Sequence, residues 1–309
     1  MEKFVWKKGA KPKDPMSRMT SEYNTREELS HKTRETVYSY GYQHELPRTE
    51  KQEQATRLVI SVFKEHVHRL GIDVQKELST RQFHFFDRAG FDREFPDLKG
   101  AFGGHGGYDT IPVVAEESEG QFFLTLLHEA AHAFAIHTYE LGTEGRLPEY
   151  RNGYAVMDRE SSFVDPRRDK MHFNAFNEGV VEMTALRLAA RYEDLFWNAG
   201  VSSEGLRDAM EHHAYAQQVS VVVKIISKLA VVYGEDELET WKRIGSGQYT
   251  GDMMWMRSIE KVFGKGALRV LDCLSTEESE EAYQRNAMVL EYFSSDDAAK
   301  REGIQGQLY

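Results

Sequence analysis

The chain lacks several features that would place it in other classes of protein. It has one cysteine, Cys273, among 309 residues, so neither an internal disulfide nor a cysteine-rich zinc ribbon can form. No window approaches 18 consecutive apolar residues, which predicts that there is no transmembrane helix. Lysine and arginine (39) are outnumbered by aspartate and glutamate (50), for a formal net charge of −11. This balance argues against nucleic acid or an anionic membrane as a general partner.

The N-terminus lacks the apolar segment of a secretory signal peptide. In its first eight residues, Met1 to Lys8, the longest apolar run is three residues, and charged residues flank that run. Together with the single cysteine, this predicts a cytoplasmic protein, although export by a route without a cleaved signal would leave the same sequence. Residues 1–47 are polar and irregular, so we predict a flexible N-terminal arm. The alternative is a regulatory or partner-binding arm, which would also be able to plug a cleft.

Apart from these absences, the composition is that of an ordinary globular enzyme. Apolar residues make up 40% and charged residues 29% of a chain that is long enough to bury a core. The few strand-like segments precede residue 120, and helical periodicity dominates the rest. We therefore predict an α+β fold, mostly helical, with a small sheet. Residues 48–309 form one domain in this interpretation, with an N-terminal subdomain at 48–141 and a helical C-terminal subdomain at 142–309.

A glycine-rich segment and a predicted strand come directly before the helix that we predict to begin at Glu119. Gly103 to Gly107 place four glycines around His105, and no Gly-Lys-Ser/Thr follows, so we interpret a loop beside a site rather than a phosphate loop. His105 is a candidate substrate contact, and an ordinary exposed histidine is the alternative. The strand that follows, at about 108–116, contains Pro112, which cannot donate a ladder hydrogen bond. We therefore predict an edge strand that comes directly before the next helix.

That helix, predicted from Glu119 to about Leu141, carries the sequence His-Glu-Ala-Ala-His, an HExxH motif. His128 and His132 are about 40° apart around the axis, so both imidazoles face one side and suit two ligands of a tetrahedral zinc. Glu129, about 100° away from His128, can reach a water on that zinc without being a ligand. The alternative is two partly buried histidines that bind no metal.

A catalytic zinc needs a third protein ligand and one open position. The metzincin pattern fails, because Ala135 and Thr138 stand where it needs glycine and histidine, and His137 is one residue away. The next helix carries Glu178 and Glu182, four residues apart on one face. One of them can bind zinc while the other supports a ligand histidine. The alternative is a pair of solvated glutamates.

HExxH followed by NExxxE, here residues 177–182, resembles the gluzincin branch of zinc metallopeptidases, the thermolysin-like group. The compact build is similar to that of the small, minimal gluzincins. The resemblance covers about residues 80–230, and within that span the two short motifs carry it. It implies a zincin-like fold whose edge strand precedes the active-site helix. It also implies one zinc ion per chain, with three ligands: His128, His132 and Glu178.

The same resemblance implies roles for further residues. Glu129 is the general base that activates water. Glu182 hydrogen-bonds a zinc-bound histidine, which we assign to His128. An extended peptide substrate adds to the edge strand, next to Val113 and Val114.

Peptide hydrolysis also requires a donor for the developing oxyanion. Tyr215 is our first candidate, with a half-buried core tyrosine as the alternative. His212 or His213 would be able to share this task. His172, just before the glutamate helix, is like His105 a candidate substrate contact, for which an ordinary exposed histidine is the alternative.

Together these motifs predict a zinc metallopeptidase that hydrolyses a peptide or protein substrate with a zinc-activated water. A second hypothesis is an inert zincin-fold binding or regulatory protein. The presence of Glu129 argues against it, because an inert protein has no chemical need of the base. A third is a zinc hydrolase of a non-peptide amide. Cleavage specificity, calcium binding and oligomeric state are left open by the sequence.

Overall fold

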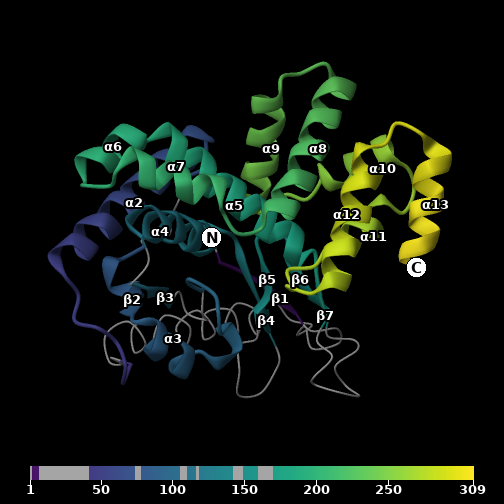
Figure 1. Cartoon of the computed structure of the whole chain (residues 1–309). Helices are drawn as coiled ribbons and strands as arrows, with labels where there is room; N and C mark the ends of the chain where they lie inside the picture. The colour runs from purple at the N-terminus through teal and green to yellow at the C-terminus, as the bar shows by residue number, and fades with distance from the viewer. Residues whose placement is uncertain are drawn as a thin grey trace, which may run out of the picture. The chain divides into compact units, whose positions relative to one another are not determined.

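The computed structural model describes residues 2–6, 42–73, 78–104, 110–115, 118–141, 149–158 and 170–309 (Figure 1). This part of the chain is mostly helical with small sheets, which agrees with the predicted α+β class.

Helices carry most of the described residues, and the strands are short. The helices are α2 (Glu50–Arg69), α3 (Arg88–Glu94), α4 (Glu119–Phe134), α5 (Asn174–Arg191), α6 (Glu193–Asn198), α7 (Ser203–Glu211), α8 (Ala216–Tyr233), α9 (Glu237–Thr250), α10 (Met256–Phe263), α11 (Ala267–Leu271), α12 (Glu280–Ser294) and α13 (Ala298–Leu308). The strands are β1 (Glu2–Trp6), β2 (Phe83–Phe86), β3 (Ile111–Val114), β4 (His137–Leu141), β5 (Glu149–Asn152), β6 (Ala155–Asp158) and β7 (Lys170–His172).

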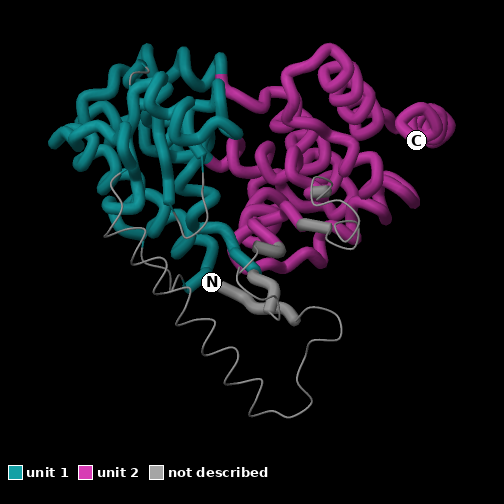
Figure 2. Tube along the Cα trace, turned by 90° about the horizontal axis from the view of Figure 1, so that it is seen from below, with its two compact units in different colours: residues 1–150, 185–212 teal, residues 151–184, 213–309 magenta. Residues whose placement is uncertain are grey.

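The chain divides into two compact units (Figure 2). Unit 1 comprises residues 1–150 and 185–212, and unit 2 comprises residues 151–184 and 213–309. The boundary predicted from the sequence, between two subdomains of one domain after residue 141, stays a prediction. Helix α7 belongs to unit 1 because it packs on α4. At this crossing a Cβ on Gly120 would collide with the carbonyl group of Gly205, so the two helices approach closely only because glycine stands there.

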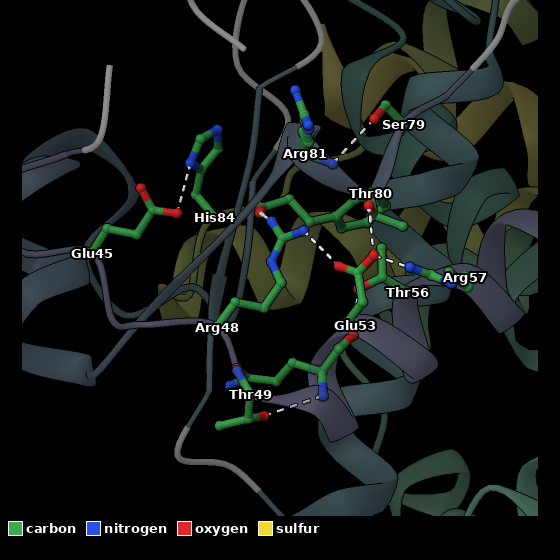
Figure 3. A network of polar contacts seen from close by, with 12 residues as sticks. Glu45, Arg48, Thr49, Glu53, Thr56, Arg57, Ser79, Thr80, Arg81 and His84 are labelled. Carbon is green, nitrogen blue, oxygen red and sulfur yellow. Dashed lines mark hydrogen bonds and ion pairs between the residues drawn. The ribbon is translucent and has the colours of Figure 1, made fainter. Parts of the chain in front are cut away.

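In unit 1, polar and aromatic contacts join α2, β2 and α4. Arg48, just before α2, donates to Glu53 Oε2 (2.8 Å) and to the carbonyl of Phe83 in β2 (Figure 3). Phe63 of α2 stacks on Phe134 of α4, with ring centroids 5.5 Å apart. These contacts give α4 a fixed support within its unit.

The end of α4 differs from the prediction. The helix ends at Phe134, short of the predicted end near Leu141, because Ala135 adopts an extended backbone with ψ of 162°. The chain then continues as β4, which pairs in parallel with β1. Residues 2–6, which the sequence interpretation assigned to a flexible arm, therefore form a strand. The assignment of residues 7–41 to that arm lies outside the described residues.

The segment after β4, predicted as part of a helical subdomain, contributes strands to unit 2. β5 and β6 form an antiparallel hairpin, and β7 pairs antiparallel with β6. The hairpin turn holds Gly153 at φ +55°, a left-handed value that glycine adopts without a Cβ clash. Residues 142–148 and 159–169 lie outside the described part of the chain.

Helix α8 contributes to the core of unit 2, next to α9 and α12 (Figure 1). Its buried side chains include Val221, Val222, Ile225 and Ile226. Among the described helices it is the one whose length and composition would allow it to cross a membrane, so the exclusion drawn from the sequence is too broad. This is weak evidence for a membrane, because the core helix of a globular protein passes the same test.

Candidate metal centre

Helix α4 presents the HExxH motif from a buried position. Ser118 caps its N-terminus by accepting a hydrogen bond from the backbone of Gln121. Every residue from 122 to 134 is buried, and the exposed fractions of His128, Glu129 and His132 are 8%, 5% and 7%. Polar side chains are rarely buried unless they are paired or coordinate a metal. The motif is therefore held inside unit 1 rather than on a solvated face.

The two histidines face each other as a metal pair would. His128 Nε2 and His132 Nε2 are 3.2 Å apart. Two nitrogen ligands of a tetrahedral zinc, each about 2.0–2.1 Å from the metal, would be separated by about 3.3–3.4 Å. The spacing of these two nitrogens therefore fits a shared ion.

Glu178 completes a group of three possible ligands. One ligand atom each from His128, His132 and Glu178 lies within 4.8 Å of the other two. Among the described residues, this is the one group of three or more histidine, cysteine or acidic side chains that could hold a metal ion. Two imidazoles and a carboxylate are the donor set of several catalytic zinc sites. The group could thus hold a metal ion, as the sequence predicts.

The two sequence neighbours of Glu178 make contacts that hold the first turns of α5 within unit 2. Asn177, which is 1% exposed, accepts a hydrogen bond from the backbone N–H of Tyr154 (2.9 Å) and so holds the β5–β6 turn on α5. A Cβ on Gly179 would lie 2.9 Å from the backbone carbonyl atoms of Gln218, so α8 packs directly on this glycine. The sequence interpretation assigned no role to either neighbour. The signals in the sequence are the asparagine of the NExxxE motif and a glycine within a helical pattern.

Glu182 contacts the segment that leads into α8. Its Oε1 is 3.4 Å from His213 Nδ1, and both side chains are largely buried. The hydrogen bond to Glu182 raises the pKa of His213 above its usual value. His212, by contrast, is an exposed side chain close to Asp208. The structure thus distinguishes the two histidines, and the support of His128 by Glu182 stays a prediction.

The other sequence candidates lie in different settings. Tyr215 precedes α8 with φ of +59°, a left-handed conformation that is uncommon for a non-glycine residue. Its role as an oxyanion donor stays a prediction. His172 Nδ1 lies 2.7 Å from Asp272 Oδ2. His137 Nε2 donates to the carbonyl of His132 (3.1 Å). His105 lies outside the described residues.

β3 is at the edge of a two-stranded sheet, as predicted, but an isolated bridge from Gly103 covers part of that edge. β3 pairs in parallel with β2 on one side, and residues 102–104 cover its other side. There the N–H of Val114 donates to Phe102, and the carbonyl of Pro112 accepts from Gly104. Val113 and Val114 are 0% and 1% exposed, and their role as substrate contacts stays a prediction. Pro112 marks the side of β3 that faces residues 102–104. A proline lacks the N–H of a ladder hydrogen bond, and this loss costs least where the partner segment is short.

The covering segment also lies against the candidate base. A Cβ on Gly103 would lie 3.0 Å from both Cγ and Oε1 of Glu129 and 2.9 Å from Thr125 Cγ2. Only a glycine lets the backbone approach the Glu129 side chain this closely. Part of the glycine-rich segment is therefore beside the site, as the sequence predicts.

Comparisons with family models, curated proteins and solved structures give no match to this chain. The site therefore has to be interpreted from its own chemistry.

Proposed function

We propose that the protein is a zinc-dependent metallopeptidase with a zincin-like fold. The observation that carries the proposal is the placement of His128, His132 and Glu178 within 4.8 Å of one another, with Glu129 directly after His128 in the sequence. Zinc is the metal that best suits two imidazoles and a carboxylate with an open fourth position. When bound, zinc would act as a Lewis acid and bring the pKa of a bound water to about 7.

The residues of the chain supply the proton transfers. Glu129 accepts a proton from the attacking water on its carboxylate and then donates it to the leaving amine. Its near-complete burial favours this role, because a carboxylate shielded from bulk water exchanges protons with the substrate rather than with solvent. His213, whose raised pKa favours the charged form, and Tyr215 are the candidate donors to the developing oxyanion.

The substrate is a peptide or protein segment in an extended conformation. Because residues 102–104 cover β3, we assign the pairing with substrate to this segment instead of to Val113 and Val114. The closeness of Gly103 to Glu129 supports this assignment, since a peptide aligned there would have its backbone near the base.

The first experiment measures metal content by plasma mass spectrometry on protein purified without chelator. About one zinc per chain is the expected result for a His-His-Glu site. Absence of zinc after dialysis against it would overturn the proposal. A peptide-library screen then tests hydrolysis, and activity confined to non-peptide amides would show a different substrate class.

The decisive variant is Glu129→Gln, which should retain zinc and lose turnover by about 100-fold or more, the usual scale of general acid–base catalysis. The matched control is Glu119→Gln on the same helix, because Glu119 is half-exposed and pairs with Lys51 at the surface. Wild-type turnover in Glu129→Gln would exclude this mechanism and show that another group acts as the base, whereas a zinc-loaded wild type without turnover would favour an inert binding protein.

A further inference from the structure

The corner that leads into α5 has an unfavourable backbone. Phe173, between β7 and α5, has φ of +57°, in the left-handed region that a non-glycine residue rarely adopts. Its carbonyl accepts from the N–H of Asn177 (2.8 Å), so Phe173 occupies the N-cap position of the helix. A phenylalanine side chain has no oxygen with which to cap the free N–H groups of the first turn. Something outside the helix must therefore hold this corner.

Asp272, which follows α11, provides that hold. Its Oδ1 accepts from the backbone N–H of Phe173 (2.8 Å), and its Oδ2 lies 2.7 Å from His172 Nδ1. One carboxylate thus binds two consecutive residues that are about one hundred positions away in the sequence. Its side chain is only 12% exposed, so water competes little for these bonds. The negative charge also lies at the N-terminus of α5, where the helix dipole favours it.

We propose that Asp272 is a positioning residue for the metal ligand Glu178. The inference rests on the proposed function for the ligand role of Glu178. Glu178 lies five residues after Phe173, about 7.5 Å further along the helix axis. A helix whose first turn is not capped frays from that end, and Glu178 is close enough to follow. By fixing His172 and Phe173, Asp272 keeps the carboxylate of Glu178 in one place for the ion.

His172 belongs to the same set of contacts. The sequence alone made His172 a weak candidate near the active site. In the structure, its Nδ1 is occupied by Asp272. We therefore assign to His172 a structural role, as the partner of the second carboxylate oxygen of Asp272.

The test compares Asp272→Ala with Asp272→Asn in the full-length protein. Zinc affinity is measured by competition with a chelator, and hydrogen exchange is measured at the amides of residues 174–178. We expect faster exchange in this turn and about tenfold weaker zinc binding in Asp272→Ala, the lower end of the range for groups that support metal ligands. Asp272→Asn should lie between, because an amide oxygen can still accept from Phe173. The control is Asp296→Ala, which removes an 82% exposed carboxylate of the same unit.

A double-mutant cycle separates positioning from general destabilisation. If Asp272 acts through Glu178, Asp272→Ala should have no further effect on zinc affinity in a Glu178→Ala background. The inference would be overturned if the losses of zinc affinity in the two variants were additive, or if Asp272→Ala bound zinc as tightly as wild type. Unchanged hydrogen exchange at residues 174–178 would show that Asp272 does not order the first turn of α5. A wild-type protein that bound no zinc would overturn the proposed function. The exchange comparison alone would then decide whether Asp272 orders this turn.

Discussion

The two helices that carry the candidate ligands are held in place in different ways. The turn of α4 with His128 and His132 lies inside a run of buried residues, and the helix is capped by its own neighbour Ser118. The turn of α5 with Glu178 depends on groups distant in sequence, among them Tyr154 and Asp272. The relative positions of two candidate ligands on one helix thus follow from the geometry of that helix. The position of a third candidate ligand on another helix depends instead on tertiary packing.

The largest effect is expected on α4. His132→Ala removes one of two nitrogens that are 3.2 Å apart, and a single remaining imidazole cannot form the pair. We expect zinc affinity to fall by more than about 100-fold, beyond the range for groups that only support ligands. His68→Ala, an exposed histidine near the end of α2, is the control. Competition with a chelator measures the zinc affinity of both variants. A wild-type zinc affinity in His132→Ala would show that His132 is not a ligand.

A smaller effect is expected where α5 packs on α8. In Gly179→Ala the new Cβ would lie 2.9 Å from the backbone of Gln218, so one helix must shift. We expect the free energy of unfolding to fall by about 1–3 kcal/mol, as for other overpacked interiors. The control is Gly303→Ala on α13, where a Cβ meets nothing within 4 Å. There the higher helix propensity of alanine should raise the free energy of unfolding by about 0.5–1 kcal/mol. Urea unfolding measures both, and equal behaviour of the two variants would contradict close packing at Gly179.

The smallest effect concerns the contact between Glu182 of α5 and His213. Glu182 raises the pKa of His213 above 6.5, so the charged form is favoured in the folded state. The stabilisation is therefore complete below about pH 6.5 and is lost as pH rises through the folded pKa of His213. We expect the difference in unfolding free energy between wild type and His213→Ala to shrink as pH rises from about 5 to 9. The exposed neighbour His212 gives the control variant His212→Ala, and a pH-independent difference for His213→Ala would contradict the pairing.

The sequence predicts some elements well because their signals are local. Ser118 marks the start of α4, and the first residue of α5 is Asn174, close to the NExxxE motif. Other parts could not be predicted, because their signals lie in partners distant in the chain. The early end of α4 goes with the pairing of β4 and β1, which joins residues more than a hundred positions apart. The cover over β3 likewise depends on how residues 102–104 fold back.

The sequence by itself determined that His128 and His132 share one side of a helix with Glu129 beside them. The helical repeat fixes that geometry whatever surrounds it. Only the tertiary structure decided that Glu178 lies within 4.8 Å of that pair, that β3 is covered and that Asp272 holds the start of α5. The physical reason is that these contacts join segments far apart in the sequence. The distance between such segments is fixed by tertiary packing and not by the number of residues between them.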